Sequence, residues 1–297
     1  MAHYLVTGGA GFIGSHLVEA LSLAGHNVTV LDNLSSGHRK NIEPFLGPNV
    51  RFVEGDIRNA ALLERLAQGC AGVFHLAALV SVPESIQRPA DSFEINLQGT
   101  FHVLESCRKH KGTRVVFASS AAVYGNVEEH PVKETTVGTP LSPYGLHKWM
   151  CEEQANLYAE LYDVNSVGLR FFNVFGPRQD PSSPYSGVIS IFIDRLSRGL
   201  APTIYGDGSQ TRDFVYVGDV VQALIKAMNS ENQGFAAYNV GRGKSVTINM
   251  LWQILCEVAG TKLQAEFGPA REGEIRTSLA DISKIKAELN YFPDIDL

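Results

Sequence analysis

The opening of the chain carries the pattern that most limits what it can fold into. A short apolar run, Tyr4–Val6, leads into Gly8, Gly9, Gly11 and Gly14, and a helical spacing of apolar residues follows. Glycine is required where the backbone takes unusual angles or lies against another group, and the free amides at the start of a helix attract anions. The pattern therefore predicts a strand, a tight turn and a helix whose N-terminus holds a phosphate group. Taken alone, it is also compatible with an ordinary strand-to-helix turn.

The second apolar run ends in an acidic residue. Val28–Leu31 is followed by Asp32, about 20 residues after the glycines, where a carboxylate accepts hydrogen bonds from the ribose of a dinucleotide. A carboxylate there would repel the additional phosphate of NADP, so the predicted cofactor is NAD. The alternative is that Asp32 is a turn residue, because Asp-Asn is common in turns.

The composition is that of an ordinary globular protein. Of the 297 residues, 44% are hydrophobic and 19% are charged. The net charge of −6 and the lack of a Lys/Arg run argue against nucleic acid as a partner. The sequence shows no run of about 18 apolar residues and no signal-peptide pattern, so no membrane partner is expected.

The four cysteines, Cys70, Cys107, Cys151 and Cys256, are scattered along the chain. Their spacing matches neither a metal site nor a disulfide framework. We therefore expect no bound metal and a reducing compartment, the cytoplasm.

Strand-like and helix-like stretches alternate over the first part of the chain. Six short apolar runs predict strands, at 3–7, 27–32, 50–54, 72–77, 113–118 and 166–171. Amphipathic stretches between them predict helices, at 13–25, 60–68, 91–111 and 144–163. Buried strands separated by helices indicate an α/β protein with a doubly wound, Rossmann-type parallel sheet. Ligands of such sheets bind at the carboxyl ends of the strands.

Beyond Arg170 the alternation becomes irregular. Further helical and strand-like stretches follow, at 188–199, 203–205, 218–229 and 247–259. We expect an NAD-binding domain over 1–175. A smaller, discontinuous substrate lobe is expected over 176–297, with part of it returning to the first domain.

Polar residues follow several of the predicted strands. Asp56 and Ile57 come after the third strand, where a carboxylate can accept a hydrogen bond from an adenine amine. Asp56 is alternatively the N-cap of the next helix. His75, at the fourth strand, is interpreted as a core histidine with its hydrogen bonds satisfied. Ser119 and Ser120 end the fifth strand, and their alternative role is to cap backbone groups.

One predicted helix begins with a pair of reactive side chains. Pro143 starts this helix, and Tyr144 and Lys148, four residues apart, share one of its faces. Such a pair alone usually marks a solvated helix face. Together with the glycine turn and the serines after the fifth strand, it is a much more specific signal.

The ordered motifs resemble a known family. T-G-G-A-G-F-I-G, S-S-A-A-V-Y-G, S-P-Y-G-L-H-K, F-F-N-V-F-G-P-R, R-D-F-V-Y-V and R-E-G-E occur in the order found in extended short-chain dehydrogenases/reductases. The chain is most similar to the NAD-dependent nucleotide-sugar epimerases, specifically those that interconvert UDP-glucose and UDP-galactose. The resemblance covers nearly the whole chain. It implies one tightly held NAD, a UDP-sugar substrate and no net redox change.

The resemblance also implies which residues hold NAD. The pyrophosphate would face the glycine turn, the adenosine would lie at the ends of the second and third strands, and the nicotinamide would lie beyond the fourth. The implied cofactor-binding residues are Gly8, Gly11, Phe12, Ile13, Asp32, Asn33, Asp56, Ile57, Leu76, Ala77, Ala78, Ser119, Tyr144, Lys148 and Phe171.

For the chemistry, the resemblance implies that Ser120, Tyr144 and Lys148 are catalytic. Tyr144 would remove the proton of the sugar's 4-hydroxyl as a hydride leaves, and the resulting ketone would be reduced from the opposite face. Lys148 and the positive nicotinamide would lower the pKa of Tyr144, and Ser120 would hydrogen-bond the 4-oxygen. The implied substrate-binding residues are Ser81, Ser120, Tyr144, Asn173, Val188, Tyr205, Arg212, Arg271, Glu274 and Ser278.

Two of these residues are arginines. Arg212 and Arg271 would clamp the two phosphates, because a planar guanidinium matches phosphate oxygens. Their alternative role is in surface salt bridges. Members of the resembled family pair the helices that correspond to 91–111 and 144–163, so a homodimer is expected.

Two positions bear on which sugar is accepted. Val80 stands where galactose-type enzymes typically have a lysine, and Ser278 stands where a bulky tyrosine would exclude an N-acetyl group. We therefore predict that UDP-N-acetylglucosamine and UDP-N-acetylgalactosamine are accepted beside the plain hexoses. The alternatives are another NAD-dependent nucleotide-sugar epimerase, a dehydratase, or a non-catalytic NAD-binding sensor. A dehydratase would carry an acidic pair where Ala121 and Ala122 stand.

Overall fold

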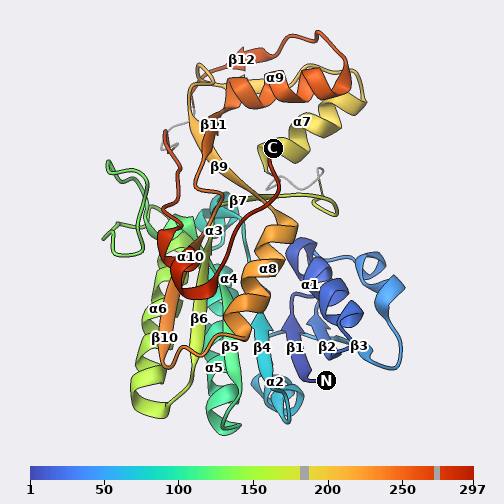
Figure 1. Cartoon of the computed structure of the whole chain (residues 1–297), viewed down its shortest axis with the longest axis vertical. Helices are drawn as coiled ribbons and strands as arrows, with labels where there is room; N and C mark the ends of the chain where they lie inside the picture. The colour runs from blue at the N-terminus through green and yellow to red at the C-terminus, as the bar shows by residue number, and fades with distance from the viewer. Residues whose placement is uncertain (181–186, 271–274) are drawn as a thin grey trace.

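A seven-stranded sheet forms the centre of the molecule (Figure 1). The computed structural model describes residues 1–180, 187–270 and 275–297. Neighbouring strands of this sheet run parallel. In sheet order they are β10 (Phe235–Val240), β6 (Ser166–Phe171), β5 (Arg114–Ser120), β4 (Gly72–His75), β1 (His3–Thr7), β2 (Asn27–Asp32) and β3 (Val50–Glu54).

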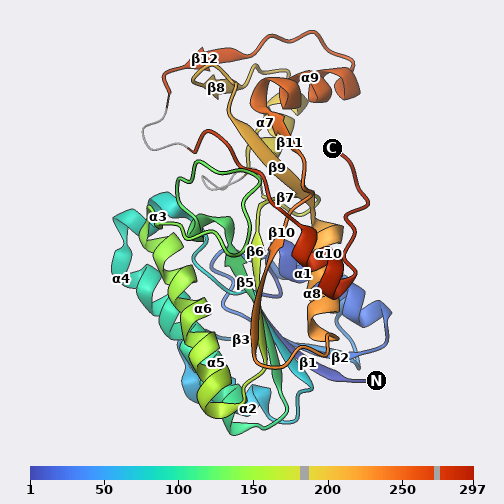
Figure 2. The same ribbon diagram turned by 60° about the vertical axis from the view of Figure 1, so that its left-hand side comes forward.

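Helices cover both faces of this sheet (Figure 2). On one face, α1 (Phe12–Leu23) packs beside α8 (Val217–Met228). On the other face, α2 (Ala60–Ala67) packs against α5 (Gly99–Lys109), which lies beside α6 (Pro143–Tyr162). Parallel strands need such long crossover connections. The predicted doubly wound α/β sheet is confirmed.

The side chains of β1 explain why both faces are covered. Tyr4 and Val6 pack into the core shared with α1 and α8, whereas Leu5 packs into the core shared with α2 and α5. Successive side chains of a strand point to opposite faces, so both faces must be buried when all three residues are apolar. A strand of this kind appears in the sequence as an unbroken apolar run.

The strand order reverses between β1 and β4. β2 and β3 lie on one side of β1, while β4 and the later strands lie on the other. The connections after β1 and β4 therefore lead to opposite faces and leave a crevice at the carboxyl edge. Doubly wound proteins bind their ligands at such a reversal.

A smaller group of elements lies beyond that edge, at the top of Figure 1. Its members are β7 (Asn173–Phe175), α7 (Val188–Ser197), β8 (Thr203–Tyr205), β9 (Thr211–Tyr216), β11 (Ser245–Thr247), α9 (Ile248–Ala259) and β12 (Glu266–Gly268). β9 is the central strand of a three-stranded sheet with β11 and β7, and β12 pairs with β8. Phe192, Leu251 and Trp252 belong to a separate core in this group. The division of the chain at residue 175 stays a prediction.

The predicted helix over 91–111 is interrupted by a wider turn. The chain passes from α4 (Pro89–Ser92) through a π-helix, η3 (Phe93–Gln98), into α5. In η3, the Asn96 side chain accepts a hydrogen bond from Leu79 N at 2.8 Å and donates one to Leu79 O at 3.0 Å. Turns of this kind often occur at functional sites. The remaining short elements are η1 (Arg39–Asn41), η2 (Glu43–Phe45), α3 (Val82–Gln87), η4 (Ala121–Val123) and α10 (Ser283–Leu289).

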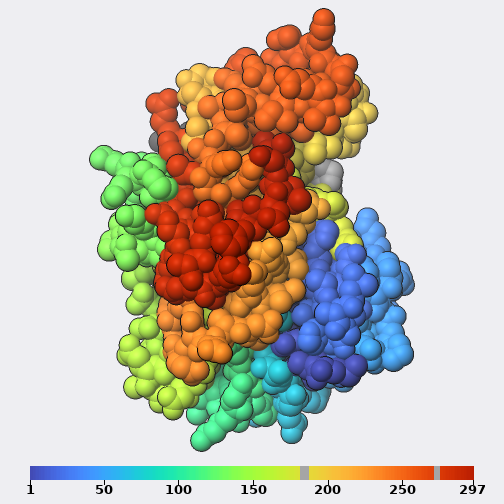
Figure 3. All heavy atoms as spheres, in the orientation of Figure 1, coloured from blue at the N-terminus to red at the C-terminus, as the bar shows by residue number. Residues whose placement is uncertain are grey.

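The segment after α10 lies across the surface, in dark red in Figure 3. The carboxylate of Asp219, in α8, accepts hydrogen bonds from Asp294 N at 3.0 Å and from Ile295 N at 3.4 Å. Lys226, also in α8, donates to Asn290 O at 2.6 Å. These bonds attach the segment to the helix that covers the main sheet.

Most of the predicted elements match observed ones. The exception among the main strands is β10, whose sequence F-A-A-Y-N-V contains two alanines and an asparagine, residues that are uncommon in strands. In the ranges that the structure describes, no helix is both long and apolar enough to cross a membrane.

Candidate active site

The turn between β1 and α1 brings backbone rather than side chains to the edge of the sheet. Gly8 has a φ of +69°, and a Cβ atom there would lie 2.6 Å from Ala77 N. A Cβ atom on Gly14 would collide with Gly8 O. Helix α1 begins without a capping side chain and without an acidic residue in its first turn. The N–H groups of that turn can therefore bind an anion.

A cavity of about 900 Å³ follows the carboxyl edge of the sheet from this turn to the ends of β4 and β5. The glycine backbone, the uncapped helix and the length of the cavity along the sheet fit a dinucleotide such as NAD. All the predicted cofactor residues and all three predicted catalytic residues line it. The predicted residues in its wall are Gly8, Gly11, Phe12, Ile13, Asp32, Asn33, Asp56, Ile57, Leu76, Ala77, Ala78, Ser81, Ser119, Ser120, Tyr144, Lys148 and Phe171.

Asp32 lies in the cavity wall and also holds the glycine turn. Its carboxylate accepts hydrogen bonds from Ala10 N at 3.0 Å and from Leu34 N at 2.8 Å. Burial raises the pKa of Asp32, and these two hydrogen bonds act in the opposite direction. Asp32 therefore acts as a turn residue in this structure. Its contact with the ribose of a dinucleotide stays a prediction.

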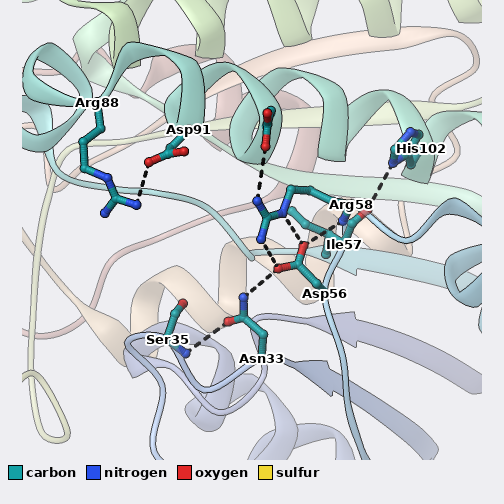
Figure 4. A network of polar contacts seen from close by, with 9 residues as sticks. Asn33, Ser35, Asp56, Ile57, Arg58, Arg88, Asp91 and His102 are labelled. Carbon is teal, nitrogen blue, oxygen red and sulfur yellow. Dashed lines mark hydrogen bonds and ion pairs between the residues drawn. The ribbon is translucent and has the colours of Figure 1, made fainter.

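Asp56 is the centre of a polar network at the end of β3 (Figure 4). It accepts hydrogen bonds from Asn33 Nδ2 at 2.9 Å and from the Arg58 guanidinium, which also reaches Glu94. The bonds from Arg58 lower the pKa of Asp56 to about 2. Asn59, rather than Asp56, caps α2, so the alternative role of Asp56 as the N-cap is wrong.

Ser120, Tyr144 and Lys148 meet at the other end of the cavity. Tyr144 is hydrogen-bonded to Ser120, whose Oγ also accepts from Ala122 N at 3.2 Å. Lys148 Nζ donates to Ala118 O at 2.7 Å and lies 5.9 Å from the centre of the Tyr144 ring. The local cause of this placement is Ser142, which caps α6 and so orients its first turn.

Burial is the largest influence on the pKa values of Tyr144 and Lys148. It raises the pKa of Tyr144, and the hydrogen bond with Ser120 counteracts that effect. It also lowers the pKa of Lys148. In this structure the Lys148 ammonium group is directed to the carbonyl of Ala118. That Lys148 and the nicotinamide together lower the pKa of Tyr144 stays a prediction.

Two predicted polar residues are engaged by the protein itself. His75 is buried between Thr7 Oγ1, at 2.7 Å, and Thr100 Oγ1, at 3.1 Å, and burial lowers its pKa to about 3. Its interpretation as a satisfied core histidine is confirmed. The Ser119 hydroxyl donates to Glu152, whose carboxylate forms an ion pair with Arg170 at 2.6 Å.

Other predicted substrate residues lie outside the cavity wall, near or within the smaller group of elements. Asn173 Nδ2 lies 3.5 Å from Ser278 Oγ, which places two residues distant in sequence side by side. An Arg212 guanidinium nitrogen donates to Ile275 O at 2.8 Å. Val188 begins α7 and Tyr205 ends β8. Arg271 and Glu274 lie outside the described residues.

Sequence reasoning missed several residues around the cavity. Arg178, at its wall, forms an ion pair with Glu19 of α1 at 2.6 Å. Leu79, another wall residue, donates its backbone N–H to the Asn96 side chain. The G-P-R motif was a visible signal for Arg178, whereas nothing local distinguishes Asn96 from any other helical residue. Among the described residues no cluster of His, Cys, Asp and Glu could hold a metal ion.

The fold and the cavity together define a class, a doubly wound α/β protein with a dinucleotide site and a serine, a tyrosine and a lysine at its end. The chain belongs to the NAD dependent epimerase/dehydratase family, whose sequence pattern matches residues 4–241. The resemblance inferred from the motifs is confirmed, and so is NAD as the predicted cofactor.

Three similar proteins share nearly the whole chain. A putative UDP-glucose 4-epimerase of Methanocaldococcus jannaschii is 44% identical, over 99% of this chain and 94% of that protein. A UDP-N-acetylglucosamine 4-epimerase from Methanobrevibacter ruminantium, solved in complex with UDP-N-acetylmuramic acid, is 41% identical with a TM-score of 0.95, over 99% and 94% of the two chains. A UDP-glucose 4-epimerase of Thermus thermophilus, solved in complex with NAD, is 38% identical with a TM-score of 0.89, over 99% and 95%.

Proposed function

We propose that the protein is a UDP-hexose 4-epimerase, which interconverts UDP-glucose and UDP-galactose through a transient 4-keto sugar. The observation that carries this proposal is the meeting of Ser120, Tyr144 and Lys148 in the cavity that contains the glycine turn. The names of the similar proteins support the same reaction. The residues proposed to hold NAD are the predicted ones in the cavity wall.

Each catalytic side chain has a distinct task. When bound, NAD supplies a positively charged nicotinamide ring that takes up a hydride and gives it back. Tyr144 is the base that takes the proton of the sugar's 4-hydroxyl, and its hydrogen bond with Ser120 gives that proton a route away from the sugar. Lys148 adds a positive charge at the same end of the cavity, which would favour the ionised form of Tyr144 that can accept this proton.

The substrate is proposed to bridge the cavity and the smaller group of elements. Ser81 and Tyr144 would face the sugar from the cavity. Asn173 and Arg212 would face the diphosphate, on the adjacent strands β7 and β9. Val188, Tyr205, Arg271 and Glu274 complete the proposed set.

The acceptance of N-acetylated sugars is proposed from Ser278. Its side chain is small and lies beside Asn173, which leaves room near the sugar for an acetamido group. The similar protein from M. ruminantium carries the name UDP-N-acetylglucosamine 4-epimerase, which supports this specificity.

The protein is further proposed to act as a homodimer in the cytoplasm. α5 and α6 lie side by side on one face of the molecule (Figure 2). They expose large apolar side chains, among them Phe101, Leu157 and Leu161. Such surfaces are typical of protein interfaces. All four cysteines are free thiols, which supports a reducing compartment.

The test is incubation of the purified protein with UDP-galactose, without added cofactor. We expect UDP-glucose as the product with no NADH released, and UDP-N-acetylgalactosamine from UDP-N-acetylglucosamine in a parallel reaction. Loss of water from the sugar would indicate a dehydratase, and accumulation of NADH a dehydrogenase. Bound NAD with no turnover of any UDP-sugar would indicate a sensor.

A further inference from the structure

Asp213 is a buried carboxylate in the centre of the smaller sheet, on β9. Its side chain has no exposed surface. Burying a carboxylate is costly unless its oxygens accept hydrogen bonds. Three backbone N–H groups donate to it, from Arg242 at 2.7 Å, Gly243 at 3.0 Å and Ala280 at 3.1 Å. One side chain thus holds two chain segments that are far apart in the sequence.

One of these segments carries Ser278. At one end, Arg276 O accepts from Thr211 N at 2.8 Å, and Ser278 N donates to Thr211 O at 3.2 Å. At the other end, the Asp213 carboxylate holds Ala280. Ser278 is therefore attached to β9 through its own N–H group and again two residues later at Ala280, and its position depends on both attachments.

The backbone of Asp213 orients a second substrate residue. Asn173 Nδ2 donates to Asp213 O at 3.1 Å, and the same amide nitrogen lies 3.5 Å from Ser278 Oγ. The neighbouring residue on β9 is Arg212. The three residues proposed to contact the diphosphate and the sugar therefore surround one buried residue, which itself lies outside the cavity wall.

We propose that Asp213 is the positioning residue of the nucleotide-sugar site. Its carboxylate holds the loop after β10 and Ala280, at the end of the segment 276–280, against β9, and this helps to set the spacing of Asn173, Arg212 and Ser278. The inference rests on the proposed function, because it assigns these three residues to the substrate. Asp213 touches neither the cavity nor the reacting carbon, so it controls affinity rather than chemistry.

The packing around the carboxylate leaves little room for adjustment. A Cβ atom on Gly241 would lie 2.9 Å from Asp213 Oδ2 and 2.8 Å from the Ala280 Cβ. Among the ionisable groups near Asp213, Arg242 favours its charged form. The pKa of Tyr291 is raised first by burial and then by the carboxylates of Asp219, Asp213 and Asp294. The Tyr291 hydroxyl donates to Gly241 O at 3.2 Å.

Protonation of Asp213 weakens this arrangement. Burial raises its pKa to about 6, against the opposing effect of the three backbone hydrogen bonds and of Arg242. A protonated oxygen is a poorer acceptor, so the segment that carries Ser278 is held less firmly in acid. The diphosphate of a nucleotide sugar is doubly esterified and does not titrate in this range. Affinity for the substrate therefore falls as the pH is lowered through about 6.

The test compares Asp213→Asn with a matched variant, Asp219→Asn. Asp219 is also buried and also accepts two backbone hydrogen bonds, but these attach the C-terminal segment instead. We expect Asp213→Asn to weaken UDP-glucose binding, measured by calorimetry, by about tenfold or more, with KM rising in parallel, kcat within about threefold and NAD content unchanged. Asp219→Asn is expected to keep the wild-type affinity.

The other outcomes bear on this inference and on the proposed function in different ways. Wild-type affinity in Asp213→Asn, or an equal loss in both variants, would assign Asp213 a structural role only. If Asp213→Asn does not fold, the wild-type protein decides: affinity for UDP-glucose must fall below about pH 6, and a flat profile contradicts the proposal. A wild-type protein that binds UDP-glucose without converting it would contradict the proposed function and leave the measurement on Asp213 valid. A wild-type protein that does not bind it would overturn both.

Discussion

The groups around Tyr144 show how burial sets the chemistry of single side chains. Burial raises the pKa of Tyr144 and lowers those of Lys148 and His75, because water does not solvate their charged forms there. In the resting state the Tyr144 phenol and the His75 imidazole are therefore both neutral. Tyr144 can act as a base only after its phenol has given its proton to solvent, and the positive charges of Lys148 and of a bound nicotinamide would stabilise the resulting phenolate.

Tyr144→Phe removes the phenol oxygen and keeps the ring. We expect kcat for UDP-galactose to fall by about 10²- to 10⁴-fold, the usual contribution of a general base. NAD content is expected to stay unchanged, because the packing of the ring is retained. Steady-state kinetics and nucleotide extraction measure the two quantities. Tyr162→Phe, which changes an exposed tyrosine at the end of the same helix, is the control. Near-normal turnover in Tyr144→Phe would mean that another group takes the proton.

His75 makes the stability of the protein depend on pH. Its folded-state pKa is about 3, whereas the ordinary value is 6.5, so below pH 6.5 the unfolded chain binds a proton that the folded chain does not. The stability that comes from neutral His75 is complete above that pH and declines as the pH falls towards 3, by up to about 1.4 kcal/mol per pH unit. Urea denaturation measures the free energy of unfolding at about pH 6.5 and at about pH 5. Between these two pH values, His75→Asn should lose less of this free energy than the wild type loses. Equal losses in the two proteins would contradict this.

Among the elements, the strands of the main sheet could be predicted because they are buried on both faces. Tyr4–Val6 is an unbroken apolar run and Val28–Leu31 is interrupted only by Thr29, a pattern typical of strands that are covered on both faces. β10 could not be predicted, because its sequence has no strand-like pattern of apolar residues. Only its pairing with β6 in the structure identifies it as a strand. The π-helix η3 could not be predicted either, because its apolar residues have the spacing of an ordinary α-helix.

The candidate site was predictable where it depends on local sequence. The glycine turn and the pair Tyr144 and Lys148 lie within short motifs, and the structure brings them to one cavity. Glu152 and Asp213 were missed, because an acidic residue in a helix or strand normally faces solvent. Only the packing of distant segments reveals that these two carboxylates are buried.

Gly8→Ala tests the glycine turn against a matched position. Gly8 and Gly25 both have positive φ angles, +69° and +76°, but a Cβ atom at Gly25 would meet nothing within 4 Å, whereas one at Gly8 would collide with Ala77. Both variants carry the strain of a left-handed residue, about 1–2 kcal/mol. Only Gly8→Ala is expected to lose bound NAD, measured as nucleotide per chain after acid extraction. Equal NAD content in the two variants would show that the cofactor lies elsewhere.

Across the whole molecule, the cofactor and the diphosphate end of the substrate are assigned to different sets of elements. The proposed NAD residues follow the carboxyl edge of the main sheet, while Asn173, Arg212 and Ser278 belong to the smaller group above it. Arg178 and Glu19 connect the chain after β7 to α1. The reacting carbon of the sugar would lie where the two sets of elements meet.

The exposed apolar face of α6 gives a test of the homodimer. Leu157 is 50% exposed on α6, and Leu23 is 80% exposed at the end of α1. We expect sedimentation to give twice the chain mass of 32.3 kDa for the wild type and for Leu23→Glu, and the single-chain mass for Leu157→Glu. A charge inside an apolar interface is strongly unfavourable, whereas one on free surface is not. A dimeric Leu157→Glu would place the interface on another face.

The first turn of α1 has no side chain that satisfies its N–H groups. A ligand that does so binds the folded chain and not the unfolded one, and so draws the folding equilibrium towards the native state in proportion to its concentration. The midpoint of thermal denaturation should therefore climb as free dinucleotide is added. In a cell, the nucleotide supply would then govern how long newly made copies of this chain survive before proteolysis.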